Sequence, residues 1–398
     1  MIPATWKRYQ LSQLVNKALS LPKPVPFDFL VKGEILRSTL GEWCVENGAG
    51  EEETLEIEYI ESVMPPEKVS DFPHEDWVSS VSCKLQGQFL TGSYDGYIRS
   101  FDYSKSATSS TQAHSAPITS ICLVPSASSQ IVASASHDLT AQLTQINIGP
   151  NSKSTPLATL HLHTAPVSSV AANNTGTQLL TASWDGIVGH WDTSIPESDE
   201  VPEVAPNERD RRKRRRVDGG GKVKRKAPVG VLKSHVGRVS RALFSIKQEK
   251  NAYSCGFDST VRVWDTENEI CVHTITASEK PFLDLALPRD PQTLLASSTD
   301  RTVTLYDVRL DSKPAAPVSL AHPATPSCLA ASSQGQQVVS GGYDGMVRLW
   351  DLRSTKGALA SFRAWEEAGK VLSVDWEGNL VGIGGEGGFT VWKVGDGA

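Results

Sequence analysis

The sequence predicts an all-β propeller of seven blades that follows a small α+β domain. A carboxylate recurs at intervals of 43, 47, 73, 42, 44 and 42 residues, a period typical of one four-stranded propeller blade per repeat. Each carboxylate is followed seven positions later by the end of a predicted strand. The seven pairs are Asp95/Asp102, Asp138/Gln145, Asp185/Asp192, Asp258/Asp265, Asp300/Asp307, Asp344/Asp351 and Glu386/Lys393.

A histidine precedes five of these carboxylates by 21 to 24 residues, so five of the nine histidines stand at one repeat position. Most of the strand ends read aromatic-Asp, and those of blades two and seven are degenerate. This pattern resembles WD-repeat proteins, in which the His and Asp hydrogen-bond across the loops at one end of a blade. We interpret these side chains as structural, because a buried charge needs such a partner. They are His74, Asp95, His114, Asp138, His163, Asp185, His235, Asp258, Asp300, His322 and Asp344.

Length and composition agree with two folded parts. The 398 residues exceed one ordinary domain, and we place the small domain at 1–64 and the propeller at 66–398. The six cysteines lack Cys-x-x-Cys spacing, as is typical of thiols in a reducing compartment. No signal-peptide pattern or long apolar run occurs. We expect a soluble intracellular protein without a metal or other cofactor of its own.

The first 64 residues predict the order of elements found in the second half of a ubiquitin-like β-grasp. Apolar positions repeat with helical spacing over residues 6–19, and Pro22 follows the end of this helix. The first hairpin of a β-grasp is missing, so we interpret the domain as N-terminally truncated. Loss of this hairpin would leave one strand edge unpaired. The later elements are strands at 27–31, 35–37 and 54–60, a turn at 32–34 and a short helix at 39–45.

Charge is distributed unevenly along the chain. The net charge is −6, yet residues 209–226 hold eleven Lys and Arg against two Asp, which leaves about −15 for the rest. This basic run lies in the one long interval between carboxylates, within an insertion at 193–230. The insertion has almost no apolar residues and its first part is acidic and Pro-rich, so we predict a disordered loop.

Three functions are open for the basic part of this loop: a solvated linker, a nuclear-import signal, or contact with RNA phosphates. Two basic clusters separated by a Gly-Gly-Gly spacer favour a bipartite import signal. A P-loop is excluded, because Val223 stands where Ser or Thr would bind magnesium. The import residues are Arg211, Arg212, Lys213, Arg214, Arg215, Arg216, Lys222, Lys224, Arg225 and Lys226.

Several segments resemble one family more specifically. They are Phe27-Asp28-Phe29-Leu30, Ile57-Glu58-Tyr59, Pro65-Pro66 and His74-Glu75-Asp76-Trp77-Val78-Ser79-Ser80. They are similar to the fungal-type ribosome-biogenesis WD-repeat family of the pescadillo–Bop (PeBoW) complex, and the similarity covers nearly the whole chain. It implies a non-enzymatic assembly factor for the large (60S) ribosomal subunit, required for processing of large-subunit and 5.8S pre-rRNA. It also implies a location in the nucleolus and nucleoplasm of the nucleus.

The resemblance implies partners as well. In this family the propeller binds the Bop-family WD-repeat protein and, through it, the pescadillo homologue. The AAA ATPase midasin grips the ubiquitin-like domain through a metal-dependent adhesion site and pulls the complex from 66S pre-ribosomal particles. The contact acid of the family falls on Glu52, as a ligand to the metal held by midasin. The alternatives are a solvated acidic turn, or Glu51 or Glu53 as the ligand.

The propeller offers a candidate partner-binding surface from its own residues. The residue before each blade carboxylate is expected in a tight turn that opens onto one end of the propeller. Aromatic side chains grouped on such a rim are typical of binding hot spots, and partial burial against neighbouring loops is the alternative. Four of the six side chains at this position are aromatic: Tyr94, Trp184, Phe257 and Tyr343.

Two other classes of function compete with a scaffold. An enzyme is not supported, because the sequence shows no nucleophile–base constellation and no Gly-x-Ser-x-Gly elbow. The other alternative is a generic nuclear WD-repeat adaptor or an RNA-binding protein that acts through the basic loop. Direct RNA binding would require basic surface outside the loop, where the chain is acidic.

Overall fold

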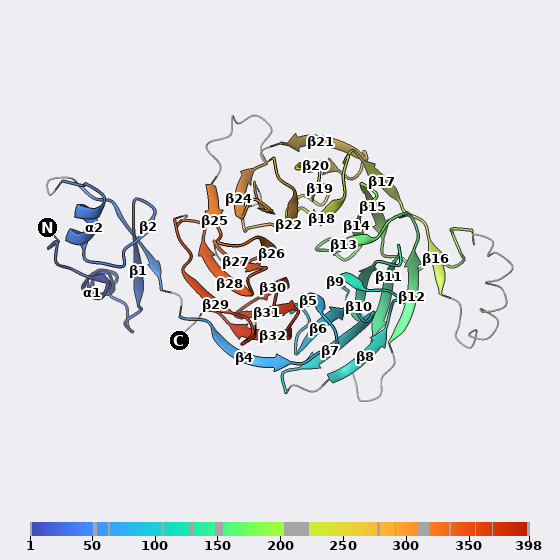
Figure 1. The fold of residues 1–398 in the computed structure, drawn as a ribbon, viewed down its shortest axis with the longest axis horizontal. Helices are drawn as coiled ribbons and strands as arrows, with labels where there is room; N and C mark the ends of the chain where they lie inside the picture. The colour runs from blue at the N-terminus through green and yellow to red at the C-terminus, as the bar shows by residue number, and fades with distance from the viewer. Residues whose placement is uncertain are drawn as a thin grey trace.

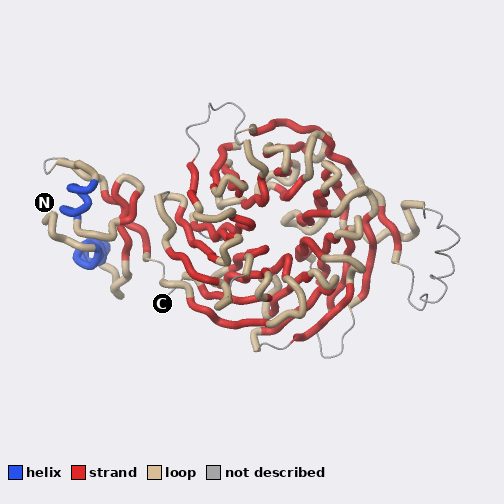
Figure 2. Tube along the Cα trace, in the orientation of Figure 1, coloured by secondary structure: helices blue, strands red, loops and turns tan. Residues whose placement is uncertain are grey.

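A ring of small β-sheets makes up most of the molecule, and a small domain that contains both described helices lies beside it (Figures 1 and 2). The structure is a computed structural model. It describes residues 2–50, 54–62, 64–104, 107–126, 130–147, 154–202, 223–276, 279–290, 292–308, 318–333, 336–354, 356–367 and 369–395.

The small domain follows the order of elements that the sequence predicts. It consists of α1 (Arg8–Leu19), β1 (Phe27–Val31), β2 (Glu34–Ile35), α2 (Leu40–Glu46) and β3 (Ile57–Glu61). The strands pair antiparallel in the order β2-β1-β3. Helix α2 begins with a capping box, in which the Thr39 hydroxyl accepts a hydrogen bond from the Glu42 N–H at 3.2 Å and the Glu42 carboxylate accepts one from the Thr39 N–H at 3.0 Å.

Apolar side chains from both helices and from the sheet form the core of this domain. Leu11 of α1, Phe29 of β1 and Trp43 of α2 belong to one buried cluster. Burying an apolar side chain of this size stabilises a fold by about 1.5–3 kcal/mol. The small sheet is therefore held mainly by its packing against the helices.

In the part of the chain that the structure describes, seven sheets form the ring, and each is one blade. Successive strands within a blade pair antiparallel. Blade one holds β5 (Val78–Ser82), β6 (Gln88–Ser93), β7 (Tyr97–Asp102) and β8 (Ala107–Gln112), and blade two holds β9 (Ile118–Val124), β10 (Gln130–Ser136), β11 (Ala141–Ile146) and β12 (Thr155–Leu160). Blade three holds β13 (Val167–Ala172), β14 (Gln178–Ser183), β15 (Ile187–Asp192) and β17 (Gly230–Lys233), and blade four holds β18 (Val239–Phe244), β19 (Asn251–Gly256), β20 (Val261–Asp265) and β21 (Ile270–Ile275).

The remaining three blades follow the same plan, and the predicted all-β propeller is confirmed. Blade five holds β22 (Phe282–Ala286), β23 (Thr293–Ser298), β24 (Thr302–Asp307) and β25 (Val318–Ala321), and blade six holds β26 (Pro326–Ala331), β27 (Gln337–Gly342), β28 (Met346–Asp351) and β29 (Ala360–Arg363). Blade seven holds β30 (Val371–Glu377), β31 (Leu380–Gly385), β32 (Gly388–Lys393) and β4 (Glu67–Phe72).

Blade seven closes the ring with strands from both ends of the propeller. Its outermost strand, β4, precedes blade one in the chain and pairs antiparallel with β32. The ring of Phe72 in β4 stacks on Phe389 of β32 at a centroid distance of 5.1 Å and lies 5.0 Å from Phe101 of blade one. Aromatic packing therefore joins the first and last parts of the propeller and resists opening of the ring.

The insertion between blades three and four is more ordered at its ends than the sequence predicts. Residues 203–222 lie outside the described residues, but strand β16 (Lys224–Lys226) runs parallel to β12 as a fifth strand of blade two. The Asp199 carboxylate accepts a hydrogen bond from the Arg225 N–H at 2.9 Å, and Glu200 accepts one from the Ala227 N–H at 2.9 Å. The prediction of disorder across 193–230 is therefore wrong at its ends, because acidic residues of the first part bind the backbone of the basic part.

Candidate functional site

A repeated polar network ties together the strands and loops within individual blades, at one end of the strands. In blade three, Trp191 donates its indole N–H to the hydroxyl of Thr181 at 2.9 Å, and this hydroxyl lies 2.8 Å from Nε2 of His163. The other ring nitrogen of His163 lies 3.1 Å from the carboxylate of Asp185. Each polar group in this buried chain has a partner, as a buried network requires. The equivalent residues are Trp264, Ser254, His235 and Asp258 in blade four, and Ser134, His114 and Asp138 in blade two.

Two of the five predicted His–Asp pairs do not form. Nδ1 of His74 lies 2.9 Å from a backbone carbonyl, and the Asp95 carboxylate instead pairs with Arg99 at 2.6 Å. In blade one the arginine four residues after the carboxylate supplies a permanent charge and a forked donor. In blade six His322, Asp344 and Arg348 are arranged in the same way. An arginine at this position does not by itself displace the histidine, because in blade four Asp258 keeps His235 at 2.8 Å with Arg262 3.6 Å away. Asp300, which has no blade histidine, accepts hydrogen bonds from Thr302.

The environment of these groups shifts their pKa values. Burial alone would raise the pKa of Asp258, but the hydrogen bond from His235 and the charge on its ring outweigh burial and lower that pKa well below its usual range. Burial lowers the pKa of the His322 imidazole to about 4. The folded protein therefore favours an ionised Asp258 and a neutral His322.

We expect stability to fall as the pH is lowered from neutrality. The unfolded chain binds a proton at His322 near the ordinary pKa of 6.5, whereas the folded chain does so only near 4. As the pH falls from about 6.5 to about 4, this difference in pKa lowers the free energy of unfolding by up to about 3 kcal/mol. Urea unfolding of the protein and of His322→Gln over this pH range measures the effect, and the variant should show the flatter dependence. Parallel pH dependences would contradict the prediction, and His273→Gln on β21 is the matched control.

Aromatic side chains form a contiguous arc along one rim of the ring. Centroid distances are 5.7 Å from Trp77 to Tyr94, 6.5 Å from Tyr94 to His137 and 5.2 Å from His137 to Trp184. The structure therefore joins two predicted rim residues, Tyr94 and Trp184, through His137. Trp77 does not follow from the repeat position, and its only sequence signal is its place between the first blade histidine and β5. We call the following set the aromatic rim: Trp77, Tyr94, His137, Trp184, Phe257 and Tyr343.

The aromatic rim is accessible and is accompanied by cations. The exposed fractions of Trp184, Phe257 and Tyr343 are 37%, 46% and 45%. The guanidinium of Arg238 lies 4.5 Å from the ring centroid of Trp184, and the ammonium of Lys370 lies 5.9 Å from that of Trp77. Half-exposed aromatic side chains beside cations suit a partner that presents apolar side chains flanked by carboxylates.

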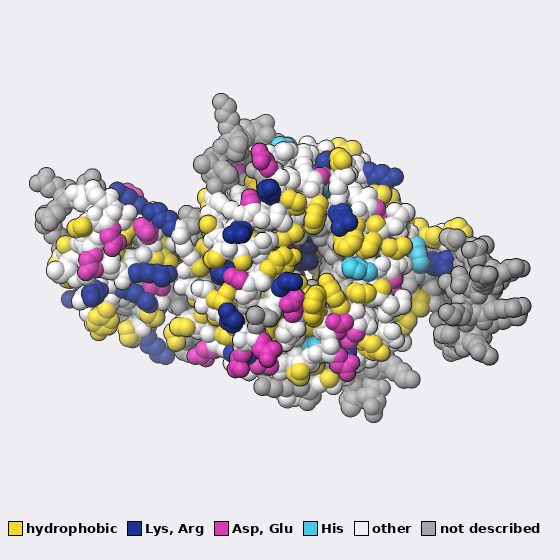
Figure 3. Space-filling model, viewed as in Figure 1, with side chains coloured by type: hydrophobic (Ala, Val, Ile, Leu, Met, Phe, Trp, Pro, Cys, Tyr) yellow, Lys and Arg dark blue, Asp and Glu magenta, His cyan; other side chains and the backbone are white. Residues whose placement is uncertain are grey.

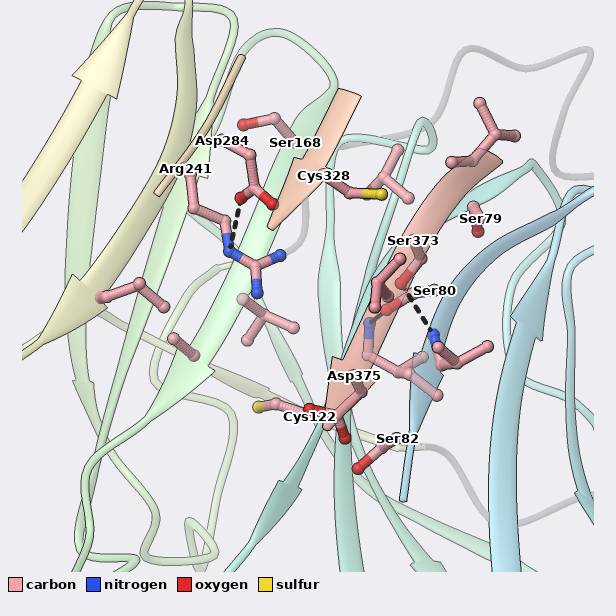
Figure 4. Close-up of a pocket in the computed structure, with 18 of the residues that line it drawn as sticks. Ser79, Ser80, Ser82, Cys122, Ser168, Arg241, Asp284, Cys328, Ser373 and Asp375 are labelled. Carbon is pink, nitrogen blue, oxygen red and sulfur yellow. Dashed lines mark hydrogen bonds and ion pairs between the residues drawn. The ribbon is translucent and has the colours of Figure 1, made fainter. Parts of the chain in front are cut away.

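The channel at the centre of the ring is lined by polar side chains that join neighbouring blades. It encloses a cavity of about 250 Å³ lined by the innermost strand of every blade (Figure 4). At the third position of these strands a side chain accepts a hydrogen bond from a backbone N–H of the next blade. The bonds are Ile121 N–H to Ser80 at 3.0 Å, Ala242 N–H to Ser169 at 3.1 Å, Leu329 N–H to Asp284 at 2.8 Å and Val81 N–H to Ser373 at 3.1 Å.

The second position of the same strands makes a complementary set of bonds. Its hydroxyl donates to a backbone carbonyl at the start of the innermost strand of the next blade. Because these polar groups are engaged within the ring, we interpret the channel as a structural seam. The recurring Ser/Thr before the third position is the sequence signal that could have found it. The bonds are Ser79 to Ile118, Thr119 to Val167 and Ser168 to Val239, each at 2.6 Å, Ser240 to Phe282 at 2.7 Å and Ser327 to Val371 at 2.5 Å.

Two predicted sites fall wholly or partly outside the described residues. Glu52 lies outside them, as do the import residues 211–216 and Lys222. Lys226 is described and is 2% exposed, with its ammonium bonded to the carboxylate of Asp192 and to Ser194. The carboxylate neutralises the buried ammonium, which is a structural role. Because its side chain is buried, Lys226 is not accessible to an import receptor in this fold. Neither described helix has the length and apolar composition that crossing a membrane requires.

Two family models match the chain. The NLE (NUC135) domain matches residues 1–44, and the WD domain, G-beta repeat, matches residues 67–102, 105–143, 154–192, 226–265, 269–307 and 317–351. The first match falls on the small domain. The matched repeats cover the degenerate blade two, and of blade seven they include β4 but not β30, β31 or β32.

Curated relatives match almost the full length of the chain. Proteins named "Ribosome biogenesis protein YTM1" are 63% identical in Laccaria bicolor, over 100% of this chain and 91% of the relative, and 58% identical in Coprinopsis cinerea, over 99% and 91%. A protein of the same name in Emericella nidulans is 32% identical over 97% of this chain and 85% of its own length. The chain therefore belongs to the YTM1 family of WD-repeat ribosome biogenesis proteins.

Proposed function

We propose that this protein is a non-enzymatic scaffold for assembly of the large ribosomal subunit and for processing of large-subunit and 5.8S pre-rRNA. The observation that carries the proposal is the 63% identity, over the full chain, to a relative named for ribosome biogenesis. The exposed aromatic rim supports it, because such rims bind other proteins and supply no catalytic group. The proposed places of action are the nucleolus and the nucleoplasm.

In this proposal two surfaces of the protein bind different partners. The aromatic rim of the propeller docks the Bop-family WD-repeat protein, which in turn brings the pescadillo homologue. The small domain is engaged by the AAA ATPase midasin, which removes the complex from 66S pre-ribosomal particles. The two surfaces have no residue in common, which supports the arrangement, because one partner can then occupy the rim while the ATPase engages the small domain.

Purification of the tagged chain from nuclear extract, after ribonuclease treatment, tests this assignment. We expect mass spectrometry to recover the Bop and pescadillo homologues together with midasin. Recovery of none of them would contradict the scaffold assignment. Recovery of these proteins only when ribonuclease is omitted would favour RNA binding through the basic loop, because phosphate contacts then hold the assembly together.

Glu52→Ala separates the midasin contact from the Bop contact. A hard cation with an open coordination position takes a carboxylate oxygen as its ligand, and alanine supplies none. We expect midasin to disappear from the co-purified proteins while the Bop homologue is retained. Glu56→Ala, an exposed acid of the same domain, is the matched control. Unchanged midasin recovery with Glu52→Ala would remove this residue from the contact.

A further inference from the structure

A cleft lies at the junction between the small domain and blade six. The ammonium of Lys356 is 3.1 Å from the carboxylate of Glu34, and the guanidinium of Arg37 donates to the carbonyl of Ala358 at 3.2 Å. These two bonds connect β2 and the residues that follow it to the segment that leads into β29. Figure 1 shows the small domain on the side of the ring that holds β28 and β29, and Figure 3 shows charged side chains on the small domain where it approaches the ring.

The cleft has a polar half and a mixed half. The polar half, about 840 Å³, is lined by Glu34, Trp43 and Lys356. The mixed half, about 480 Å³, is lined by Met64 and Leu349 together with the Arg8–Asp28 ion pair. Hollows of this size accommodate a peptide segment or a small ligand. Both halves share the following lining residues: Ile35, Arg37, Leu359 and Ala360.

Two strand edges border the cleft. Strand β2 is the last strand in the order β2-β1-β3, and β29 is the last in the order β26-β27-β28-β29, so each has one strand partner among the described residues. An unpaired edge presents a row of backbone N–H and C=O groups that an extended chain can satisfy. Strand β29, with four residues against two in β2, offers the longer template.

A buried donor in the cleft wall also lacks a partner. The side chain of Trp43 is 4% exposed, and its indole N–H has no hydrogen-bond partner among the residues that the structure describes. Leaving a buried donor unsatisfied costs about 1–3 kcal/mol. Because the indole nitrogen itself is buried, a ligand carbonyl that satisfied it would have to displace side chains of the cleft wall. This donor and the open strand edge both need hydrogen-bonding groups that the backbone of an extended peptide can supply.

The charges at the centre of the cleft indicate one feature of that peptide. Arg37 is exposed, and its guanidinium bonds a neutral carbonyl, which leaves donors free to take a carboxylate in a forked geometry. Lys356 is already neutralised by Glu34. A carboxylate at the centre of the segment therefore complements Arg37, and an apolar side chain suits the half beside Met64.

We propose that this junction cleft binds an extended segment of a partner protein, which adds as a strand to β29, pairs a carboxylate with Arg37 and places an apolar side chain beside Met64. The site is separate from the aromatic rim and does not depend on the proposed function. Binding there would also fix the small domain against the ring, since one segment would contact both.

Selection from a phage-displayed library of random peptides on the full-length protein tests the proposal. We expect enriched sequences with β-strand preference, one acidic residue and one apolar residue. A fluorescein-labelled selected peptide should bind Arg37→Glu about tenfold more weakly, as expected for loss of a carboxylate pair with charge reversal. Lys17→Glu, an exposed lysine of α1, and Trp184→Ala in the aromatic rim should leave the affinity unchanged.

A spectroscopic readout locates the peptide independently of affinity. The ¹H–¹⁵N signal of the Trp43 indole should shift when the selected peptide is added, whereas that of Trp6 in the same domain should not. Enrichment of no sequence, equal affinity for Arg37→Glu, or an unmoved Trp43 signal would each overturn the proposal. Because Arg37 is exposed, its substitution leaves the core of the domain intact.

Discussion

Asp284→Ala is expected to lower the free energy of unfolding by about 3–5 kcal/mol. The carboxylate of Asp284 lies at the channel seam between blades four, five and six (Figure 4). It accepts hydrogen bonds from the N–H groups of Leu285 at 2.9 Å and Leu329 at 2.8 Å. Arg241 approaches it to 3.5 Å as an ion pair without hydrogen-bond geometry. Alanine would leave two buried donors and one partly buried charge without their acceptor.

Urea unfolding with matched variants measures this effect. Burial raises the pKa of the Asp284 carboxyl, and the charge of Arg241 acts against that rise. Removing the negative charge while keeping the shape of the side chain is therefore expected to have only a small effect on stability. Asp284→Asn keeps one acceptor oxygen and should cost less than alanine. Ser373→Ala removes a single acceptor at the equivalent seam position and should cost about 1–2 kcal/mol. Equal losses for Asp284→Ala and Ser373→Ala would show that the carboxylate has no special role in joining the blades.

The double variant Trp184→Ala, Tyr343→Ala is expected to weaken binding of the Bop-family partner about 100-fold. Each exposed aromatic residue at a binding hot spot contributes about 1–2 kcal/mol, and 1.4 kcal/mol corresponds to a factor of ten. Both side chains are more than one third exposed, so their removal leaves the blade core in place. Loss of Trp184 also removes the surface on which Arg238 rests.

Titration calorimetry with the purified partner propeller gives the affinity, and thermal unfolding confirms that the double variant is folded. The matched control is Ile270→Ala, Val272→Ala on β21, which removes two exposed apolar side chains from the outer edge of blade four. We expect the control to bind like the unmodified protein. An unchanged affinity in the rim variant would place the partner on another surface.

The sequence was sufficient to predict the architecture because its signals are local and periodic. The spacing of the blade carboxylates predicts the propeller, and helical and alternating patterns place α1 and β1 with little error. The repeat position also placed Trp184 and Tyr343 in turns at the end of a blade, but it left open whether neighbouring loops bury them; both are more than one third exposed. These inferences need only backbone geometry and the position of a residue within a repeat.

Only the tertiary structure decided which polar groups meet. Blades one and four both carry a histidine, an aspartate and an arginine four residues after the aspartate, yet Asp95 binds Arg99 whereas Asp258 binds His235, and only the folded arrangement of the donors decides between them. Composition predicted a disordered loop with an accessible import signal, but Lys226 is buried against Asp192. The seam of the channel and the junction cleft likewise depend on segments far apart in the chain. Periodicity thus determines the elements of this protein, and competition among donors and acceptors brought together by folding determines its contacts.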